Sequence, residues 1–496
     1  MTASNSTDRA YAAIDLGAES GRVVLGRFDG ERARLEVVHR FANRPVPLPD
    51  GLRWNLLHLF AEALEGVGRA AAATALDGVG VDAWGVDYAL LDEHDRVLGL
   101  PFHYRDPRTR RMVGRAHARV AREDMYAVTG TQTLPINTVF QLLADEGTPA
   151  LERAARIALV PDLFALWLTG TLANEATAAS TTGLLDARTG TWARELVARL
   201  GLPGAPFEGD PVEPGSTLGA VLGHHDGAAG LAVHAVAGHD TASAFAAAPV
   251  ADGARAAILS SGTWSLLGLE LEAPVLSARA CAYNLTNERG IDATTRLLSN
   301  VMGLWLVQEC RREWEGSGYD ELHRLAAAAR PDVPLFDPDD DAFLPAGPMC
   351  ARIDAACGRA GQAPPRDPGE YVRSILTSLA CRYRLVLDRL ERVSGERVAC
   401  VHVVGGGARN ELLCRLTADL TGRPVLAGPV EATALGNVLV QARATGELRS
   451  RAELRAVARA SAQPVAYEPA GDGEATYRRF LDLTGLDAGA EAAVAR

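Results

Sequence analysis

The sequence predicts the same β-hairpin twice in this chain of 496 residues. In each hairpin, the first strand ends at a polar residue and a glycine-containing turn leads into the second strand. The apolar run at residues 11–17 places Asp15 near its end, and a second strand is predicted from Val23 to Phe28. Residues 255–268 repeat this pattern, with serine and threonine hydroxyls at the place of Asp15. We therefore predict two structurally related halves, joined near residue 245.

Helical segments separate the predicted strands. Leu56 to Ala73 has apolar residues at helical spacing, with Asn55 as a predicted N-cap, and a buried strand follows at residues 79–81. In the second half, a long helix from Glu370 to Val393 precedes a buried strand at residues 398–404. This alternation predicts an α/β fold, and the length predicts more than one domain.

Composition limits the partners of the chain. A net charge of -12 argues against binding to a nucleic-acid backbone. No run reaches the ~18 apolar residues that a membrane span needs. Seven cysteines, an odd number with no CxxC pair, fit reduced thiols better than a disulfide scaffold. We expect a cytoplasmic protein that binds a small molecule, with no nucleic-acid or membrane partner.

The turn after Asp15 is a candidate phosphate loop. Gly17 and the residues from Ser20 to Arg22 would bring backbone N–H groups, a hydroxyl and a guanidinium to phosphate oxygens. Asp15 could hold Mg²⁺ through water, because a hard cation prefers oxygen ligands. Glu19 weakens this hypothesis, since a carboxylate repels phosphate. An ordinary hairpin turn is the alternative.

Asp240 is the second acid at a predicted strand end, in Gly-His-Asp-Thr after the apolar run 231–238. It could accept the proton of a hydroxyl that attacks a phosphoryl group, a reaction in which positioning and charge neutralisation do most of the work. The alternative is that Asp240 only caps the following helix.

A run of three glycines at residues 405–407, between a strand and a helix, favours nucleotide binding. A dinucleotide fold is disfavoured, because the sixth position of its motif is Asn410 and the run lies late in the chain. No GxxxxGK[ST] motif is present, so a P-loop is excluded.

Two further groups have weaker signals. A polar-aromatic group could bind a polyol, although Trp84 could equally be a core residue; its members are Trp84, Asp87, His103, Tyr104, Arg105 and Asp106. The triplet at residues 224–226, His-His-Asp, lacks a third ligand at suitable spacing and is interpreted as a loop rather than a metal site.

From about Ala13 to about Tyr467, the chain resembles the FGGY family of carbohydrate kinases. The segments that carry the resemblance are residues 15–22, 84–87, 100–106, 135–138, 161–162, 239–243, 260–265, 300–305, 403–407 and 428–437. Residues 260–265 and 300–305 are most similar to family members that act on L-rhamnulose.

The resemblance implies an α/β fold of two actin-like, ribonuclease H-like domains with a cleft between them. Residues 1–245 would form the sugar-binding domain with the first phosphate loop, and residues 246–496 the ATP-binding domain. It implies ATP-dependent phosphorylation of L-rhamnulose at O1, giving L-rhamnulose 1-phosphate in L-rhamnose degradation, by a monomer or homodimer.

The resemblance also implies a role for each matching residue. Asp240 would be the catalytic proton acceptor, and Mg²⁺ would lie near Asp15 and Asp240. The sugar-binding residues would be Gly85, His239, Asp240, Thr241 and Asn300. The ATP-binding residues would be Ala18, Glu19, Ser20, Gly21, Arg22, Thr263, Gln308 and Gly406.

Two alternatives to this function stay open. Another ketose, such as L-fuculose, L-ribulose or D-xylulose, would leave the fold and the base unchanged. A non-catalytic actin-like sensor of sugar or nucleotide would not need the acid at position 240. If the chain is a kinase, we expect its two halves to close on ATP and the sugar and so exclude water.

Overall fold

The computed structural model describes residues 8–225, 227–251, 253–314, 318–471 and 473–487. The chain divides into two compact units. Unit 1 contains residues 1–252, 270–297 and 431–462, and unit 2 contains residues 253–269, 298–430 and 463–496. Two late segments therefore belong to the unit that the N-terminal half builds. Asp226, the last member of the His-His-Asp triplet, lies outside the described residues.

The first sheet, in unit 1, has the strand order β3-β2-β1-β6-β10-β9. The elements of unit 1 are β1 (Arg9–Leu16), β2 (Ser20–Phe28), β3 (Ala33–Ala42), β4 (Val46–Leu48), β5 (Gly51–Arg53), α1 (Leu56–Ala73), β6 (Gly78–Ala83), β7 (Tyr88–Leu91), η1 (Pro107–Thr109), α2 (Met112–Arg119), α3 (Arg122–Thr129), α4 (Thr138–Ala144), α5 (Pro149–Glu152), β8 (Arg156–Leu159), α6 (Val160–Thr169), α7 (Ala176–Ala179), η2 (Ser180–Thr182), α8 (Arg194–Arg199), η3 (Ala205–Phe207), β9 (Thr217–Ala220), β10 (Ala232–His234), α9 (Asp240–Ala246), α10 (Ala278–Ala282), β13 (Thr286–Arg289), η4 (Ile291–Ala293), α16 (Ala432–Ala444) and α17 (Arg451–Ser461).

The second sheet contains the consecutive strands β14-β12-β11-β15-β16-β17. The elements of unit 2, where β12 and β14 start or end across its boundary, are β11 (Ala256–Ser261), β12 (Trp264–Leu271), β14 (Thr295–Met302), α11 (Trp305–Glu313), α12 (Tyr319–Ala328), η5 (Asp341–Phe343), α13 (Met349–Arg359), α14 (Pro368–Ser394), β15 (Cys400–Val404), η6 (Gly406–Arg409), α15 (Glu411–Thr421), β16 (Val425–Ala427), β17 (Val465–Tyr467) and α18 (Glu474–Thr484).

The two sheets repeat one topology, as the two predicted hairpins suggest. Strand β1 pairs antiparallel with β2 and parallel with β6, and β11 pairs antiparallel with β12 and parallel with β15. Each sheet continues with a further parallel strand, β10 or β16, and ends on an antiparallel one, β9 or β17. The predicted α/β fold of two related halves is confirmed.

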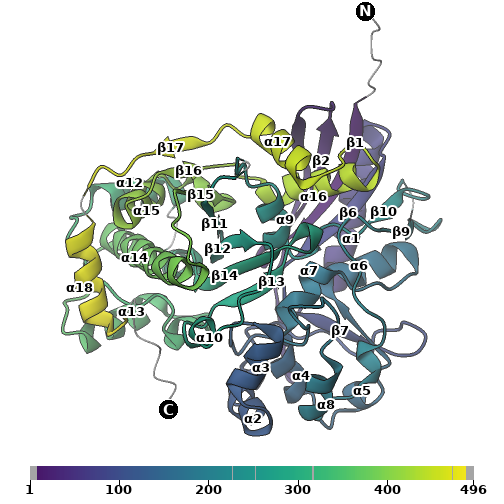
Figure 1. Ribbon diagram of the computed structural model, residues 1–496, viewed down its shortest axis with the longest axis horizontal. Coiled ribbons are helices and arrows are strands. Elements are labelled where there is room, and N and C mark those ends of the chain that lie inside the picture. Colours follow the sequence, from purple (N-terminus) through teal and green to yellow (C-terminus); the bar gives the residue numbers. More distant parts are fainter. Residues whose placement is uncertain (1–7, 226, 252, 315–317, 472, 488–496) are drawn as a thin grey trace, which may run out of the picture. The chain divides into compact units, whose positions relative to one another are not determined.

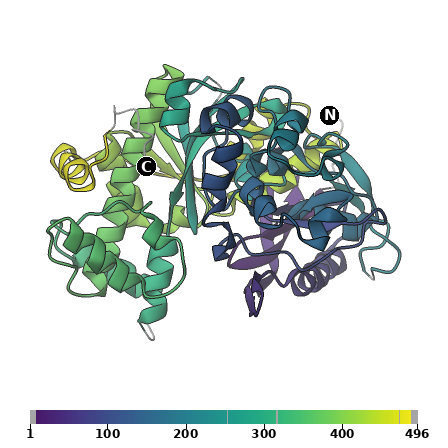
Figure 2. The same ribbon diagram turned by 90° about the horizontal axis from the view of Figure 1, so that it is seen from below.

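Helix α16, from the late segment of unit 1, packs against β1 and α9 and lies beside the first strands in both views (Figure 1; Figure 2). Gly436 permits this close approach, because a Cβ there would lie 1.9 Å from the carbonyl oxygen of Ser243. The amides of Asn437 and Gln441 donate to backbone carbonyls of β6 and β1, over 3.2 Å and 3.0 Å. The core of unit 1 is therefore completed by a segment more than 400 residues from its first strand.

Local expectations from the sequence agree with these elements. Helix α1 spans the predicted residues, and the side chain of Asn55 accepts a hydrogen bond from the N–H of His58. All seven cysteines are free. Among the described residues, no helix is both long enough and apolar enough to span a membrane.

Candidate active site

Two carboxylates of unit 1 lie at the carboxyl ends of neighbouring parallel strands, and a third begins helix α9 beside them. Asp15 at the end of β1 is in register with Asp82 at the end of β6. Ala83, the last residue of β6, forms a parallel bridge with His239, and its N–H donates to the carbonyl of Gly238 over 2.9 Å. Asp240 follows directly. In α/β sheets, ligands bind at this edge of the strands.

Asp15 is held by Arg22 across the β1–β2 hairpin. Its Oδ2 accepts from Nε of Arg22 over 2.8 Å and from Nη2 over 2.6 Å, and Arg22 also pairs with Glu431. Asn43 supports the turn between these residues, because its side chain donates to the carbonyl of Gly17 and its backbone N–H to that of Glu19. The predicted phosphate loop, residues 18–22, is thus an ordered turn. The guanidinium of Arg22 in this turn is already bound by two carboxylates, those of Asp15 and Glu431.

Asp82 was missed in the sequence, although it is a strand-end acid like Asp15. The residue is fully buried, and its Oδ2 accepts from the side-chain amide of Asn437 over 2.6 Å. Burial raises the pKa of Asp82 well above its usual value, and the charges of Asp15 and Asp240 raise it further. Its Oδ1 is buried with no hydrogen-bond partner among the described residues. Carboxylate oxygens that can accept hydrogen bonds therefore gather at this edge of the first sheet.

Asp240 is the first residue of helix α9 and does not cap it. The N-cap is His239, where no side-chain cap hydrogen bond forms. The Asp240 side chain stays 29% exposed, and its Oδ1 accepts from the hydroxyl of Thr241 over 3.0 Å. Loss of solvent raises the pKa of Asp240; the His239 contact opposes this rise, and the charge of Asp15 adds to it. A carboxylate with a raised pKa and partial exposure is suited to accept a proton.

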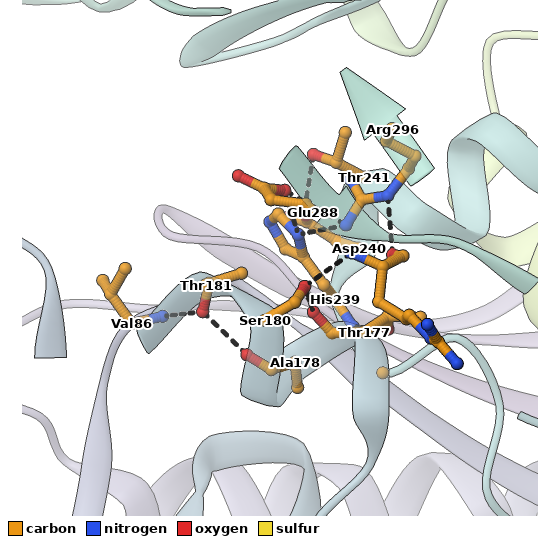
Figure 3. Close-up of polar contacts among 12 residues, drawn as sticks. Val86, Thr177, Ala178, Ser180, Thr181, His239, Asp240, Thr241, Glu288 and Arg296 are labelled. Carbon is orange, nitrogen blue, oxygen red and sulfur yellow. Dashed lines mark hydrogen bonds and ion pairs between the residues drawn. The ribbon is translucent and has the colours of Figure 1, made fainter. Parts of the chain in front are cut away.

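A buried ion pair lies on the other side of His239 (Figure 3). Nε2 of His239 lies 3.5 Å from Oδ1 of Asp240, and its Nδ1 lies 3.3 Å from Glu288 and 3.2 Å from Nη2 of Arg296. Arg296 is fully buried and pairs with Glu288 over 3.1 Å. Burial lowers the pKa of Arg296, while neighbouring carboxylates, first that of Glu288, oppose the change. His239 is therefore fixed between charged groups.

Gly85 lies in a turn that is held in an unusual conformation. The next residue, Val86, has φ of 68°, in the left-handed region that β-branched residues avoid. Its N–H donates to the hydroxyl of Thr181 over 3.0 Å, and its carbonyl accepts from the hydroxyl of Thr138 over 2.6 Å. A Cβ on Gly85 would lie 2.9 Å from the side chain of Thr181, so a larger residue there would displace Thr181.

The polar-aromatic group is a core cluster rather than an open surface. Asp87 accepts hydrogen bonds from both indoles, over 2.5 Å from Trp54 and 3.0 Å from Trp84, and from the amide of Gln141 over 2.8 Å. Trp54 also stacks on His103 with ring centroids 4.1 Å apart. The carboxylate of Asp87 is satisfied within the protein, which favours the interpretation of Trp84 as a core residue.

The predicted ATP residues of the second half lie together in unit 2. The amide of Gln308 donates to the hydroxyl of Thr263 over 3.4 Å. The glycine turn after β15 packs on the end of β11, where a Cβ on Gly407 would lie 2.0 Å from Oγ of Ser261. Gly406 itself is exposed. Asn300 is partly buried on β14, in the same unit.

The acidic edge of unit 1 fits a hard cation. Carboxylate oxygens are the ligands such a cation prefers, and the buried Oδ1 of Asp82 lacks a partner among the described residues. In the described part of the chain, no group of three or more His, Cys, Asp or Glu side chains is arranged to hold a metal ion. Mg²⁺ keeps several waters in its coordination shell, so carboxylates that form no closed cluster can contact it through water.

Comparison with known proteins decides the family. The model of the N-terminal domain of the FGGY family of carbohydrate kinases matches residues 10–246, and that of the C-terminal domain matches residues 257–445. The chain belongs to the FGGY family of carbohydrate kinases. The family resemblance drawn from the sequence is confirmed.

Relatives of this FGGY kinase match along almost the whole chain. It is 40% identical to a rhamnulokinase of Bacteroides thetaiotaomicron over 465 residues, which cover 92% of this chain and 96% of the relative. It is also 40% identical to a rhamnulokinase of Pectobacterium atrosepticum over 482 residues, covering 95% and 96%.

Solved structures of other kinases share the fold. A gluconate kinase from Lactobacillus acidophilus matches with a TM-score of 0.78 at 15% identity, covering 98% of this chain and 99% of that one. A xylulose kinase from Rhodospirillum rubrum matches with a TM-score of 0.74 at 19% identity, covering 95% and 96%. The two-domain, actin-like fold of the FGGY kinases is therefore confirmed for this chain.

Proposed function

We propose that this kinase transfers the γ-phosphoryl group of ATP to O1 of L-rhamnulose, giving L-rhamnulose 1-phosphate in L-rhamnose degradation. The observation that carries the proposal is the 40% identity to rhamnulokinases over more than nine-tenths of both chains. The partly exposed carboxylate of Asp240, beside two strand-end acids, supports it independently.

Asp240 is the base in this mechanism. The C1 hydroxyl of the ketose attacks the γ-phosphorus of ATP, the bond from that phosphorus to the bridging oxygen of ADP breaks, and the hydroxyl proton moves to the carboxylate of Asp240. The hydrogen bond from Thr241 holds one carboxylate oxygen, and His239 lies beside the same oxygen. General-base assistance of this kind contributes about 10²–10⁴-fold to the rate.

Mg²⁺, held through water near Asp15 and Asp240, would neutralise charge on the transferred phosphoryl group. For the sugar we propose contacts from Gly85, His239, Asp240, Thr241 and Asn300. For ATP we propose Ala18, Glu19, Ser20, Gly21, Arg22, Thr263, Gln308 and Gly406. Because the guanidinium of Arg22 is bound by Asp15, we assign the phosphate contacts of this turn chiefly to its backbone.

We retain three further proposals from the sequence. The two family domains divide along the sequence after residue 245, although residues 270–297 and 431–462 pack in unit 1; the chain acts as a monomer or homodimer, and it works in the cytoplasm. The seven free cysteines support the last of these, because thiols persist in a reducing compartment.

Sugar-dependent release of ADP, measured with Mg²⁺ and ATP across L-rhamnulose, L-fuculose, L-ribulose and D-xylulose, tests the function. We expect the highest kcat/KM with L-rhamnulose. A preference for another ketose would correct the substrate alone. Failure of every sugar to stimulate ADP release would instead favour the actin-like sensor.

A further inference from the structure

Residues 175–182, with the sequence Glu-Ala-Thr-Ala-Ala-Ser-Thr-Thr, form a buried polar segment that the mechanism above does not use. The segment comprises helix α7 and the short helix η2. Its polar residues are almost completely buried, with Thr177 and Thr182 at 0% exposure. Buried hydroxyls and carboxylates need hydrogen-bond partners. Several of the partners of this segment are backbone N–H groups near the proposed sugar site.

Glu175 and Thr177 bind the backbone that leads into Asp240. The N–H of Gly238 donates to Oε2 of Glu175 over 2.9 Å, and the N–H of His239 donates to the hydroxyl oxygen of Thr177 over 3.1 Å. The hydroxyl of Thr177 in turn donates to Oε2 of Glu175 over 2.6 Å. Both N–H groups before Asp240 are thus fixed by two side chains of one segment.

Ser180 and Thr181 bind two other segments near the site, the end of strand β13 and the turn at Gly85 (Figure 3). The hydroxyl oxygen of Thr181 accepts from the N–H of Val86, the strained residue after Gly85. The hydroxyl oxygen of Ser180 accepts from the N–H of Arg289 over 2.9 Å, next to Glu288. Each hydroxyl also donates to a carbonyl within the segment, over 2.7 Å from Ser180 and 2.8 Å from Thr181, so their orientations are set.

Thr182 differs from these residues in one respect. It is a threonine of the same segment and as buried as Thr177, but its hydroxyl donates to the carbonyl of Ala179 over 2.6 Å and accepts from the N–H of Leu184 over 3.1 Å. Both bonds therefore remain local, to residues within three positions in the sequence. The contrast with Thr177 separates a hydroxyl that supports the fold from one that supports a loop of the site.

We propose that Glu175, Thr177 and Thr181, within residues 175–182, are positioning residues of the sugar site. Through Glu175 and Thr177 the segment sets the place of Asp240, and through Thr181 it holds the turn at Gly85 in its strained conformation. The inference rests on the proposed role of Asp240 as base. Because a misplacement of about 1 Å at a reacting group can lower a rate by about 10²-fold, an anchor of this kind acts on kcat without touching the substrate.

The matched variants Thr177→Val, Thr177→Ser and Thr182→Val test the proposal, with the ketose that gives the highest rate in the sugar panel. Valine removes the hydroxyl and keeps the shape, whereas serine keeps the hydroxyl. We expect Thr177→Val to lower kcat by about 10-fold or more, with KM for ATP within about twofold of the wild type. Thr177→Ser should recover most of kcat, and Thr182→Val should lose comparable thermal stability while kcat stays near the wild-type value.

Equal kcat in Thr177→Val and Thr182→Val would overturn the proposal. If Thr177→Val does not fold, Thr181→Val compared with Thr181→Ser decides through KM for the sugar, which must rise in the valine variant only; an unchanged KM overturns the positioning role. Asp240→Asn is measured alongside. Normal turnover in Asp240→Asn would refute the role of Asp240 as the base. This outcome is distinct from a failure of the positioning role proposed for Thr177 and Thr181.

Discussion

The carboxylate of Asp15 accepts two hydrogen bonds from the guanidinium of Arg22, over 2.8 Å from Nε and 2.6 Å from Nη2. The two residues face each other across the β1–β2 hairpin, and Arg22 also pairs with Glu431 at the start of α16. One guanidinium, 19% exposed, therefore joins the predicted phosphate loop to residues 431–462 of unit 1 and offsets negative charge beside Asp82.

Removal of this cation should destabilise unit 1. In Arg22→Gln, the carboxylates of Asp15 and Glu431 lose a partner in a site where the Asp15 side chain is only 7% exposed, so we expect a loss of about 3–5 kcal/mol in the free energy of unfolding. Arg22→Lys keeps the charge but not the paired geometry and should lose less. Urea unfolding measures both, and equal stability of wild type and Arg22→Gln would contradict the prediction.

Asp240→Asn should abolish most turnover without unfolding the chain. The substitution keeps the size of a side chain that forms no N-cap and removes its capacity to take a proton. We expect kcat to fall by about 10²–10⁴-fold, with unchanged thermal stability and ATP binding. Coupled detection of ADP with calorimetric titration of ATP measures these quantities. Thr241→Val, which removes only the hydrogen bond to Oδ1, should give a smaller fall.

Much of the fold could be predicted from the sequence because local signals agreed with the final packing. Helix α1 begins after Asn55 and ends at Ala73 as its spacing indicates. The return of residues 431–462 to unit 1 could not be found this way, since it depends on contacts such as Gly436 against Ser243, which have no local signature.

In the candidate site, too, the sequence reveals some residues and not others. Asp15 and Asp240 have a visible pattern, an acid after an apolar run, and Asp82 has this pattern too. Arg296 carries no such signal, because nothing near it in the sequence shows that its guanidinium will be buried against Glu288 and His239. Polar residues whose partners come from distant strands are the part that only the three-dimensional structure identifies.

Two adjacent glycines should respond differently to alanine. At Gly407 a Cβ would meet Oγ of Ser261 at 2.0 Å, whereas at Gly406 a Cβ would have no atom within 4 Å from the described residues beyond its two chain neighbours. Gly407→Ala should therefore lower the melting temperature, because either Ser261 or the turn must move. Gly406→Ala should keep the stability and raise KM for ATP, because its new methyl group lies where we place the nucleotide. An unchanged KM for ATP in Gly406→Ala would remove this residue from the ATP site.

Glu175 should make the stability of the protein depend on pH. Burial raises the pKa of Glu175 from 4.5 to about 7, against the opposing effect of its hydrogen bonds from Thr177, Ala178 and Gly238. Between these two pH values the native state holds a proton that the unfolded state has released, so the free energy of unfolding falls as the pH rises through this window, by about 3 kcal/mol in all.

Buried Asp87, whose pKa is raised to about 6, contributes to the same slope, so only part of the dependence belongs to Glu175. Glu175→Gln cannot ionise and should flatten that part. Urea unfolding midpoints of wild type and Glu175→Gln at pH 5, 6, 7 and 8 measure the difference. The stability of the wild type relative to Glu175→Gln should fall from pH 5, where the wild-type carboxyl is protonated in the native state, to pH 8, where it is ionised. Parallel curves would mean that Glu175 ionises in the native state at its ordinary pKa.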